Sequence, residues 1–267
     1  MKAISAAKPY TNMTYALAAL MLITAGAGLA GPSIYGDFTS PQRVAESQGQ
    51  DVVTLIVAVP LLLFAVRVTQ RSDVHGSLLW VGTLGYTLYV YLIYAYGGLY
   101  SFCFPLYVAT LGLCLFSIIG LLNGLDADAI HRQLSPSGSP TLTSRRVIAG
   151  YLVGTAALLA VIWSGAIASA IATAVPADGT LIYVTDLAFV LPVFALAGIW
   201  YWQRRPWGTV LSGIMLVKAV TLGLSIVAGQ LIAVNRGVGG EPFLAAFFGV
   251  FTLVGLATTV LYLRNTD

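Results

Sequence analysis

The sequence predicts an all-α fold, a polytopic bundle of eight transmembrane helices with both termini cytoplasmic. Three observations lead to this prediction. The 267 residues are 58% hydrophobic and only 9% charged, whereas a soluble domain carries about 25% charged residues. Apolar runs of about 20 residues, the length that one helix needs to cross a bilayer, recur along the chain. The basic residues between these runs fall almost entirely on one side of the predicted membrane.

The runs are continuous, which favours helices over the short alternating segments of a membrane barrel. We expect a single transmembrane domain over residues 1–267, with spans at about 15–30, 51–68, 78–96, 102–122, 147–173, 180–202, 208–233 and 243–263. The first run could pass for a signal peptide, but seven more spans follow and no clear cleavage site ends it. We therefore expect it to stay as the first span.

Polar and proline-containing segments separate the spans. Residues 32–50 are predicted to be a polar connection, so that Asp51 opens the second span. Pro60 lies inside that span and predicts a kink. Pro105 lies in the first turns of the fourth span, where proline costs little. The longest polar interval, Asn123–Arg146, is too short for a large soluble domain.

Eight spans place both termini on one side, and the basic residues test this arrangement. Ten of them share the side of the N-terminus, namely Lys2, Lys8, Arg67, Arg71, Arg132, Arg145, Arg146, Arg204, Arg205 and Arg264. Only Arg43 and Arg236 lie on the other side. This bias follows the positive-inside rule and predicts cytoplasmic termini in a plasma-membrane protein.

Lys218 is the residue around which a functional hypothesis can be built. It lies near the middle of the seventh span and is the only lysine or arginine so placed. A charge at this depth is costly and normally faces a protein interior or water. At 100° per residue, Thr221 and Ser225 share its face of the helix. These residues are interpreted as a water-accessible or solute-binding surface, or else Lys218 is satisfied by a backbone carbonyl or snorkels to the interface.

Two aspartates near the outer ends of spans are further candidates. Asp186, in the sixth span, is a counter-charge for Lys218, a protonatable site, or a first-turn acid favoured by the helix dipole. A direct pair with Lys218 is not expected, because the two side chains lean in opposite directions. Asp51 is a helix cap or first-turn acid, or part of a polar cluster at a membrane mouth. Each aspartate precedes a proline, Pro60 or Pro192, and we interpret this as coincidence rather than an internal repeat.

The third span is rich in tyrosine. On the helical wheel, one face carries Tyr86, Tyr89, Tyr96 and Tyr100, while Tyr91 and Tyr94 fall elsewhere. Phenols on one face could line a cavity, or could belong to the interfacial belt and ordinary packing. Tyr86 and Tyr89 lie too deep for the belt.

Several classes of site are not indicated by the sequence. Both histidines fall in predicted cytoplasmic loops, so no histidine is available to bind haem within the membrane, and no cluster has metal-ligand spacing. We find no catalytic triad, phosphate loop or dinucleotide motif, and no long basic run for nucleic acid. Cys103 and Cys114 are about 16 Å apart on one helix, too far for a disulfide. A lysine in the seventh span invites comparison with retinal proteins, but the third span has no acidic residue that could be the counterion of a retinal bound to Lys218. We therefore expect no cofactor and no metal.

The stretches Gln48–Leu63, Leu78–Gly97 and Asp186–Leu224 resemble sequences of uncharacterised bacterial multi-span membrane proteins. The resemblance covers much of the chain and implies no activity.

Three hypotheses on function remain. The first is binding or transport of a small solute or proton through an internal polar cavity formed by Lys218, Asp186, Asp51 and the tyrosines of the third span. The second is a membrane-embedded enzyme acting on a lipid or quinone, and the third is a structural or assembly subunit. Membrane lipids and a small solute are the expected partners, and the sequence does not indicate the oligomeric state.

Overall fold

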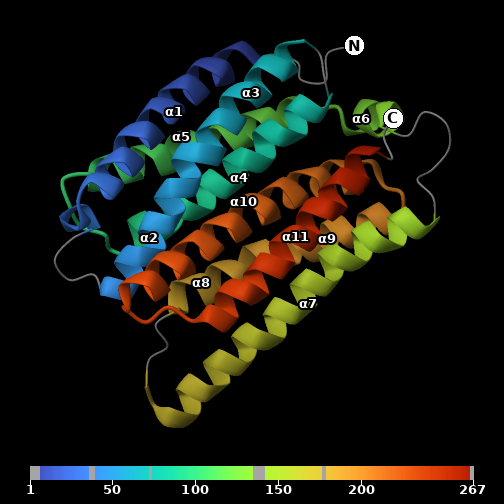
Figure 1. The fold of residues 1–267 in the computed structure, drawn as a ribbon. Coiled ribbons are helices and arrows are strands. Elements are labelled where there is room, and N and C mark those ends of the chain that lie inside the picture. The colour runs from blue at the N-terminus through green and yellow to red at the C-terminus, as the bar shows by residue number, and fades with distance from the viewer. Residues whose placement is uncertain (1–6, 36–39, 72–73, 135–141, 176–178, 265–267) are drawn as a thin grey trace. The chain divides into compact units, whose positions relative to one another are not determined.

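The computed structural model describes residues 7–35, 40–71, 74–134, 142–175 and 179–264 of the chain (Figure 1). Every regular element in the described residues is a helix. The elements are α1 (Ala7–Ala30), η1 (Pro32–Tyr35), α2 (Pro41–Val53), η2 (Thr54–Ala58), α3 (Val59–Gln70), α4 (Val74–Tyr96), α5 (Phe104–Gly124), α6 (Ala127–Gln133), α7 (Leu142–Thr173), α8 (Thr180–Thr185), η3 (Asp186–Val190), α9 (Leu191–Trp202), α10 (Pro206–Arg236) and α11 (Pro242–Arg264).

Eight helices in the described chain are long and apolar enough to cross a membrane. The prediction of an all-helical membrane protein with eight spans is therefore confirmed, and the chain is an integral membrane protein. Several helices extend beyond the predicted spans, because α1 begins at Ala7 and α7 at Leu142. The short helix α6 lies in the interval that was predicted to be a polar loop.

The second span begins earlier in the chain than predicted. Residues 32–50 were predicted to be a polar connection, but a continuous helical segment covers Pro41–Gln70. Ser40 is the N-cap of α2, and its hydroxyl accepts a hydrogen bond from the backbone N–H of Arg43 at 3.3 Å. Pro41 follows directly, at a position where its missing N–H costs no hydrogen bond. The interpretation of Asp51 as a helix cap or first-turn acid is therefore wrong.

The chain forms two compact units. Unit 1 comprises Met1–Asp126 and Leu216–Ala257, and unit 2 comprises Ala127–Met215 and Thr258–Asp267. In unit 1, α1 packs against α5 and α3, and α4 packs against both α3 and α5, as Figure 1 shows. In unit 2, α7 packs along α9. Gly198 of α9 provides the close approach, since a Cβ there would lie 2.9 Å from the backbone oxygen of Ala149.

Two spans contain a π-helical segment of five residues, η2 in the second span and η3 in the sixth. Each segment closes with an i→i−5 hydrogen bond, from Val59 N–H to Thr54 O and from Leu191 N–H to Asp186 O. Proline follows in both cases, at Pro60 and Pro192. Because proline lacks an N–H and its ring clashes with the carbonyl four residues earlier, the wider turn relieves the helix just before it. The two aspartate–proline pairs therefore share a local structure, a π-helical segment directly before the proline. This was not predicted, because the pairs were interpreted as coincidence.

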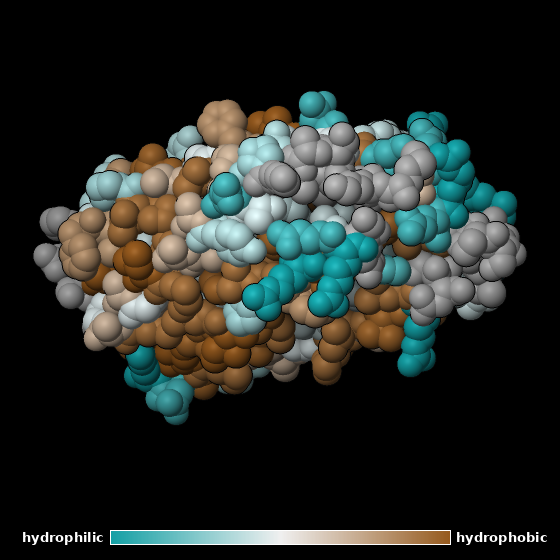
Figure 2. Space-filling view, turned by 90° about the horizontal axis from the view of Figure 1, so that it is seen from above, coloured by the Kyte–Doolittle hydropathy of each residue, from teal (hydrophilic) through white to brown (hydrophobic). Residues whose placement is uncertain are grey.

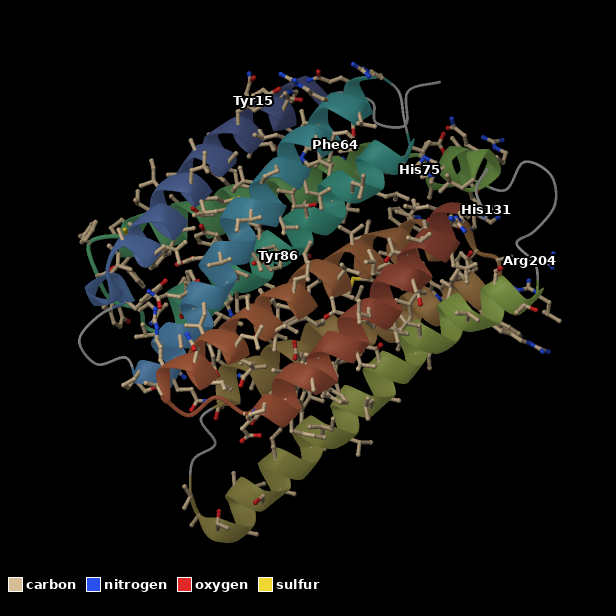
Figure 3. All side chains as sticks on the ribbon, viewed as in Figure 1. Tyr15, Phe64, His75, Tyr86, His131 and Arg204 are labelled. Atoms are coloured by element: carbon tan, nitrogen blue, oxygen red, sulfur yellow. The ribbon has the colours of Figure 1, made fainter. Side chains whose placement is uncertain are left out.

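Hydrophobic side chains are exposed along the spans, as expected of surfaces that face lipid. Tyr15 on α1 is 45% exposed and Phe64 on α3 is 58% exposed, and both are labelled in Figure 3. Figure 2 shows broad hydrophobic areas on the visible face, with hydrophilic residues in smaller groups. Polar residues of the spans, in contrast, are often buried, so the side chains that could bind or react lie in the interior of each unit.

Gly49 of α2 gives a test of the packing within unit 1. A Cβ at Gly49 would overlap the backbone N and Cα of Gly229 on α10. We expect Gly49→Ala to destabilise the protein by about 1–3 kcal/mol, because one helix must move. Gly112→Ala on α5 is the matched control, since nothing lies within 4 Å of a Cβ there. Thermal unfolding in detergent measures both, and equal midpoints for the two variants would contradict the close contact of α2 with α10.

Candidate functional site

Asp51 lies at the centre of a buried polar cluster in unit 1. It is placed about 15 Å along α2 from Pro41, and its side chain is 2% exposed. Tyr35 of η1 donates a hydrogen bond to Oδ2, and Tyr94 of α4 lies 3.0 Å from Oδ1. The Tyr94 hydroxyl is also 2.9 Å from the backbone oxygen of Ser47, so it bridges the main chain and the carboxylate. Asp51 is therefore held by phenols from two other elements.

A group of aromatic rings surrounds this carboxylate, and we call it the tyrosine cluster: Tyr35, Tyr91, Tyr94 and Tyr107. The rings meet edge to face or tilted, with centroids 5.2 Å apart for Tyr94 and Tyr107 and 5.7 Å apart for Tyr91 and Tyr94. Such arrangements are favourable for aromatic quadrupoles. Three transmembrane segments and η1 contribute, because the Tyr91 hydroxyl also lies 2.5 Å from the Thr24 hydroxyl on α1. The cluster thus ties α1, α4 and α5 to the Asp51 segment.

The space beside Asp51 is closely filled. Gly28 of α1 faces the carboxylate, and a Cβ there would overlap both Asp51 Oδ2 and the Tyr35 hydroxyl. Glycine is required at this position because the α1 backbone itself contacts the hydrogen-bonded pair. The carbonyl oxygen of Gly28 also accepts a hydrogen bond of 3.3 Å from Gln48 Nε2.

Tyr86 of α4, labelled in Figure 3, extends the polar interior toward α10. Its side chain is fully buried, and its hydroxyl donates to the backbone oxygen of Gln50 at 3.2 Å. The Thr54 hydroxyl lies 3.3 Å from the same phenol, and the Ser225 side chain of α10 lies beside it. Tyr86 therefore joins the residue before Asp51 to the polar face of α10.

Lys218 lies on that face of α10, two helical turns before Ser225. The side chain is only 6% exposed, and its Nζ is 4.4 Å from the ring centroid of Tyr89 on α4. This distance is within the range of a cation–π interaction. Thr221, between Lys218 and Ser225, is 2% exposed and donates to the backbone oxygens of Val217 and Lys218. We call the buried residues Asp51, Thr54, Tyr86, Ser225, Thr221 and Lys218 the polar track.

A second network joins the end of α10 to α2. Arg236 Nη1 donates to Gln48 Oε1 at 2.5 Å, and Gln230 Nε2 donates to Glu46 Oε1 at 3.3 Å. Gln230 Oε1 accepts a hydrogen bond from the backbone N–H of Glu241, the residue directly before α11. The amide side chain of Gln48 therefore bridges Arg236 and α1 close to Asp51.

Asp186 lies in unit 2, at the first residue of η3. Its side chain is 6% exposed, and its Oδ2 accepts a hydrogen bond of 3.0 Å from the indole nitrogen of Trp163 on α7. The Trp163 ring packs on Tyr183 with centroids 4.9 Å apart. Asp186 is thus a buried carboxylate held by an aromatic donor, as Asp51 is in unit 1.

The predicted tyrosine face divides in the structure. Tyr86 and Tyr89 are buried, but Tyr96 and Tyr100 are 74% and 72% exposed. The residues that hold Asp51, Tyr35 and Tyr94, were not predicted, and neither were Tyr91 and Tyr107, which pack beside them. The helical wheel placed Tyr91 and Tyr94 away from the face of Tyr86 and Tyr89. Tyrosines off that face were the available sequence signal for a second group of phenols. Both cysteines are buried and free, as predicted.

In the described residues, no group of three or more His, Cys, Asp or Glu side chains could hold a metal ion. No protein-family model, curated protein or solved structure matches the chain. The resemblance to uncharacterised bacterial membrane proteins stays a prediction.

The contact between Lys218 and Tyr89 can be measured with a double-mutant cycle. We expect a coupling energy of about 1–2 kcal/mol between Lys218→Met and Tyr89→Leu, because the cation is desolvated beside the ring. Tyr89→Phe is the control, since it keeps the ring and removes only the hydroxyl. Unfolding free energies in detergent provide the cycle. Additive effects of Lys218→Met and Tyr89→Leu would show that the ring does not stabilise the charge.

Proposed function

We propose that this protein carries a small solute or proton across the membrane through the polar interior of unit 1. The observation that carries the proposal is the polar track, which follows one face of α10 and, through Tyr86, reaches the backbone oxygen of Gln50, the residue before Asp51. Charged and polar side chains inside a membrane are expensive, and those that persist commonly mark a substrate or ion pathway. The members of the track are almost fully buried.

Within this proposal, Lys218 binds an anionic group or exchanges a proton, while Thr221, Ser225 and Tyr86 supply hydroxyls between it and Asp51. Hydroxyl groups both donate and accept hydrogen bonds, so a row of them can pass a proton or solvate a small ion. Asp186 and Trp163 form a separate polar site in unit 2. The plasma membrane and the cytoplasmic position of both termini are parts of the same proposal, supported by the distribution of basic residues.

Flux measurements in lipid vesicles test the proposal with two probes, protons and chloride, each followed by an entrapped dye. We expect the purified protein to pass at least one of them faster than protein-free vesicles. Lys218→Met and Asp51→Asn should lower that flux about tenfold or more, an effect of ~1.4 kcal/mol on the barrier. Flux equal to that of empty vesicles for both probes would contradict transport through the track.

A matched pair of threonines separates transport from structural support. Thr221, in the track, and Thr110, on α5 outside it, are both buried and both donate to the carbonyl four residues earlier in their own helix. Replacing either with valine removes the same kind of bond. We expect Thr221→Val to lower flux and Thr110→Val to leave it unchanged at similar thermal stability. Equal effects of the two variants would favour a purely structural role.

The orientation is tested with reporters fused to the C-terminus of the chain expressed in a bacterium. We expect a C-terminal green fluorescent protein to fluoresce, because it folds in the cytoplasm, and a C-terminal alkaline phosphatase to be inactive. The opposite pattern would place the C-terminus outside and reverse the direction of the track.

A further inference from the structure

Asp51 is a carboxylate inside a membrane-spanning helix, and its surroundings define what it can bind. In the described chain, the hydrogen bonds to this carboxylate come from two phenols, and no lysine or arginine donates to it. The titratable and charged groups that face it are Tyr35 from η1, Tyr86, Tyr91 and Tyr94 from α4, Cys103 and Tyr107 at the start of α5, and, acting on Tyr35, Arg236 from α10.

The carboxyl group is the member of this cluster suited to gain and lose a proton. Burial, and next the charge of Asp51, raises the pKa of Tyr35 well above its ordinary value, so this phenol stays neutral. A neutral phenol can donate to a carboxylate and can accept from a carboxylic acid. Tyr35 and Tyr94 can therefore hydrogen-bond Asp51 in both of its forms by rotating their hydroxyl hydrogens.

The packing favours a proton over a metal cation or a larger solute. The backbone of α1 at Gly28 contacts the Asp51–Tyr35 pair so closely that a methyl group would overlap both. A sodium ion requires several oxygen lone pairs around it, whereas Tyr35 donates its hydroxyl hydrogen to the carboxylate and Tyr94 has one hydroxyl hydrogen to share between Asp51 Oδ1 and the Ser47 carbonyl. A proton needs no such space, because it becomes part of the carboxyl group.

We propose that Asp51 is a proton-binding site that loads and unloads one proton in each cycle of the protein. In uptake, a hydronium ion from solvent gives up one proton, so that one of its O–H bonds breaks, the carboxyl O–H bond forms and a water molecule is left; release to water reverses this step. Tyr35 accepts from the acid and donates to the carboxylate, while Tyr94 fixes the other oxygen and the Ser47 carbonyl. This inference rests on the proposed transport function and names the proton as its substrate.

The contacts also provide groups for proton transfer on the side of α10. The Tyr86 hydroxyl contacts the backbone oxygen of Gln50, the residue before Asp51, and the Thr54 hydroxyl, and Ser225 lies beside it. Ser225, Thr221 and Lys218 follow along one face of the helix. A row of hydroxyls therefore lies between the residue before Asp51 and the amine of Lys218.

Infrared difference spectroscopy detects the proton directly, because only a protonated carboxyl group shows a carboxylic C=O stretch. Spectra are recorded on the protein in lipid vesicles while the pH changes between about 5 and 9, where perturbed carboxyl groups titrate. We expect a carboxylic band at the acid end that Asp51→Asn removes. Asp186→Asn, the same substitution in unit 2, should retain the band.

Tyr35→Phe serves as the second variant in case Asp51→Asn does not fold. It should shift the same band to higher frequency, because the carboxyl group loses one hydrogen bond, and Tyr94→Phe should do likewise. The inference is overturned if no carboxylic band in this pH range depends on Asp51 or Tyr35, or if the band stays constant across the range.

The spectra and the flux assay separate the two proposals. A titrating Asp51 band together with no flux of either probe would remove transport and keep the proton site. Proton flux that survives Asp51→Asn, with no Asp51 band, would keep transport and overturn the inference about this residue.

Discussion

The hydrogen-bonding demand of buried polar groups governs how this chain is built. A hydrocarbon interior offers no partners, so each polar side chain in a span must find one within the protein. Threonines meet the demand cheaply, by donating to a carbonyl of their own helix, as Thr83, Thr110 and Thr155 do. Asp51 cannot do this, because a carboxylate needs donors. Its donors come from η1 and α4, and these elements meet α1 and α5 around the tyrosine cluster.

Most of the fold could be predicted from hydropathy, because each span had to contain a continuous apolar run. The failure at the second span has a physical cause. The segment from Pro41 to Gln50 contains Gln42, Arg43 and Glu46, which resemble loop residues in a hydropathy profile. Glu46 is hydrogen-bonded to Gln230, and Gln48, in the same segment, is hydrogen-bonded to Arg236 and to the α1 backbone; these partners lie 20 or more residues away in the sequence. A polar helix satisfied by distant residues has no hydrophobic signal of its own.

The candidate site could be predicted only in part. Lys218, Asp51 and Asp186 were identifiable because charge is rare in a span, and the helical wheel correctly placed Thr221 and Ser225 beside Lys218. The partners of Asp51 were not identifiable. Tyrosine is common in membrane proteins, and its role depends on which neighbouring helix it faces, which a single helical wheel does not determine. Tyr35 comes from a short connection that no periodicity marks.

The π-helical segments affect which deletions this chain can tolerate. A π turn contains one residue more than an α-helical turn, so the helix after η2 is rotated by about 100° relative to an unbroken α-helix. Losing one residue between Thr54 and Ala58 would keep the length and apolarity of the span. It would also let the π turn close as an ordinary α-helical turn, so Gln48 and Asp51 before it and Leu62 after it would keep their relative orientation. The π turn is therefore where the span tolerates the loss of one residue best, whereas a deletion in an α-helical stretch would rotate one end of the span by about 100° relative to the other.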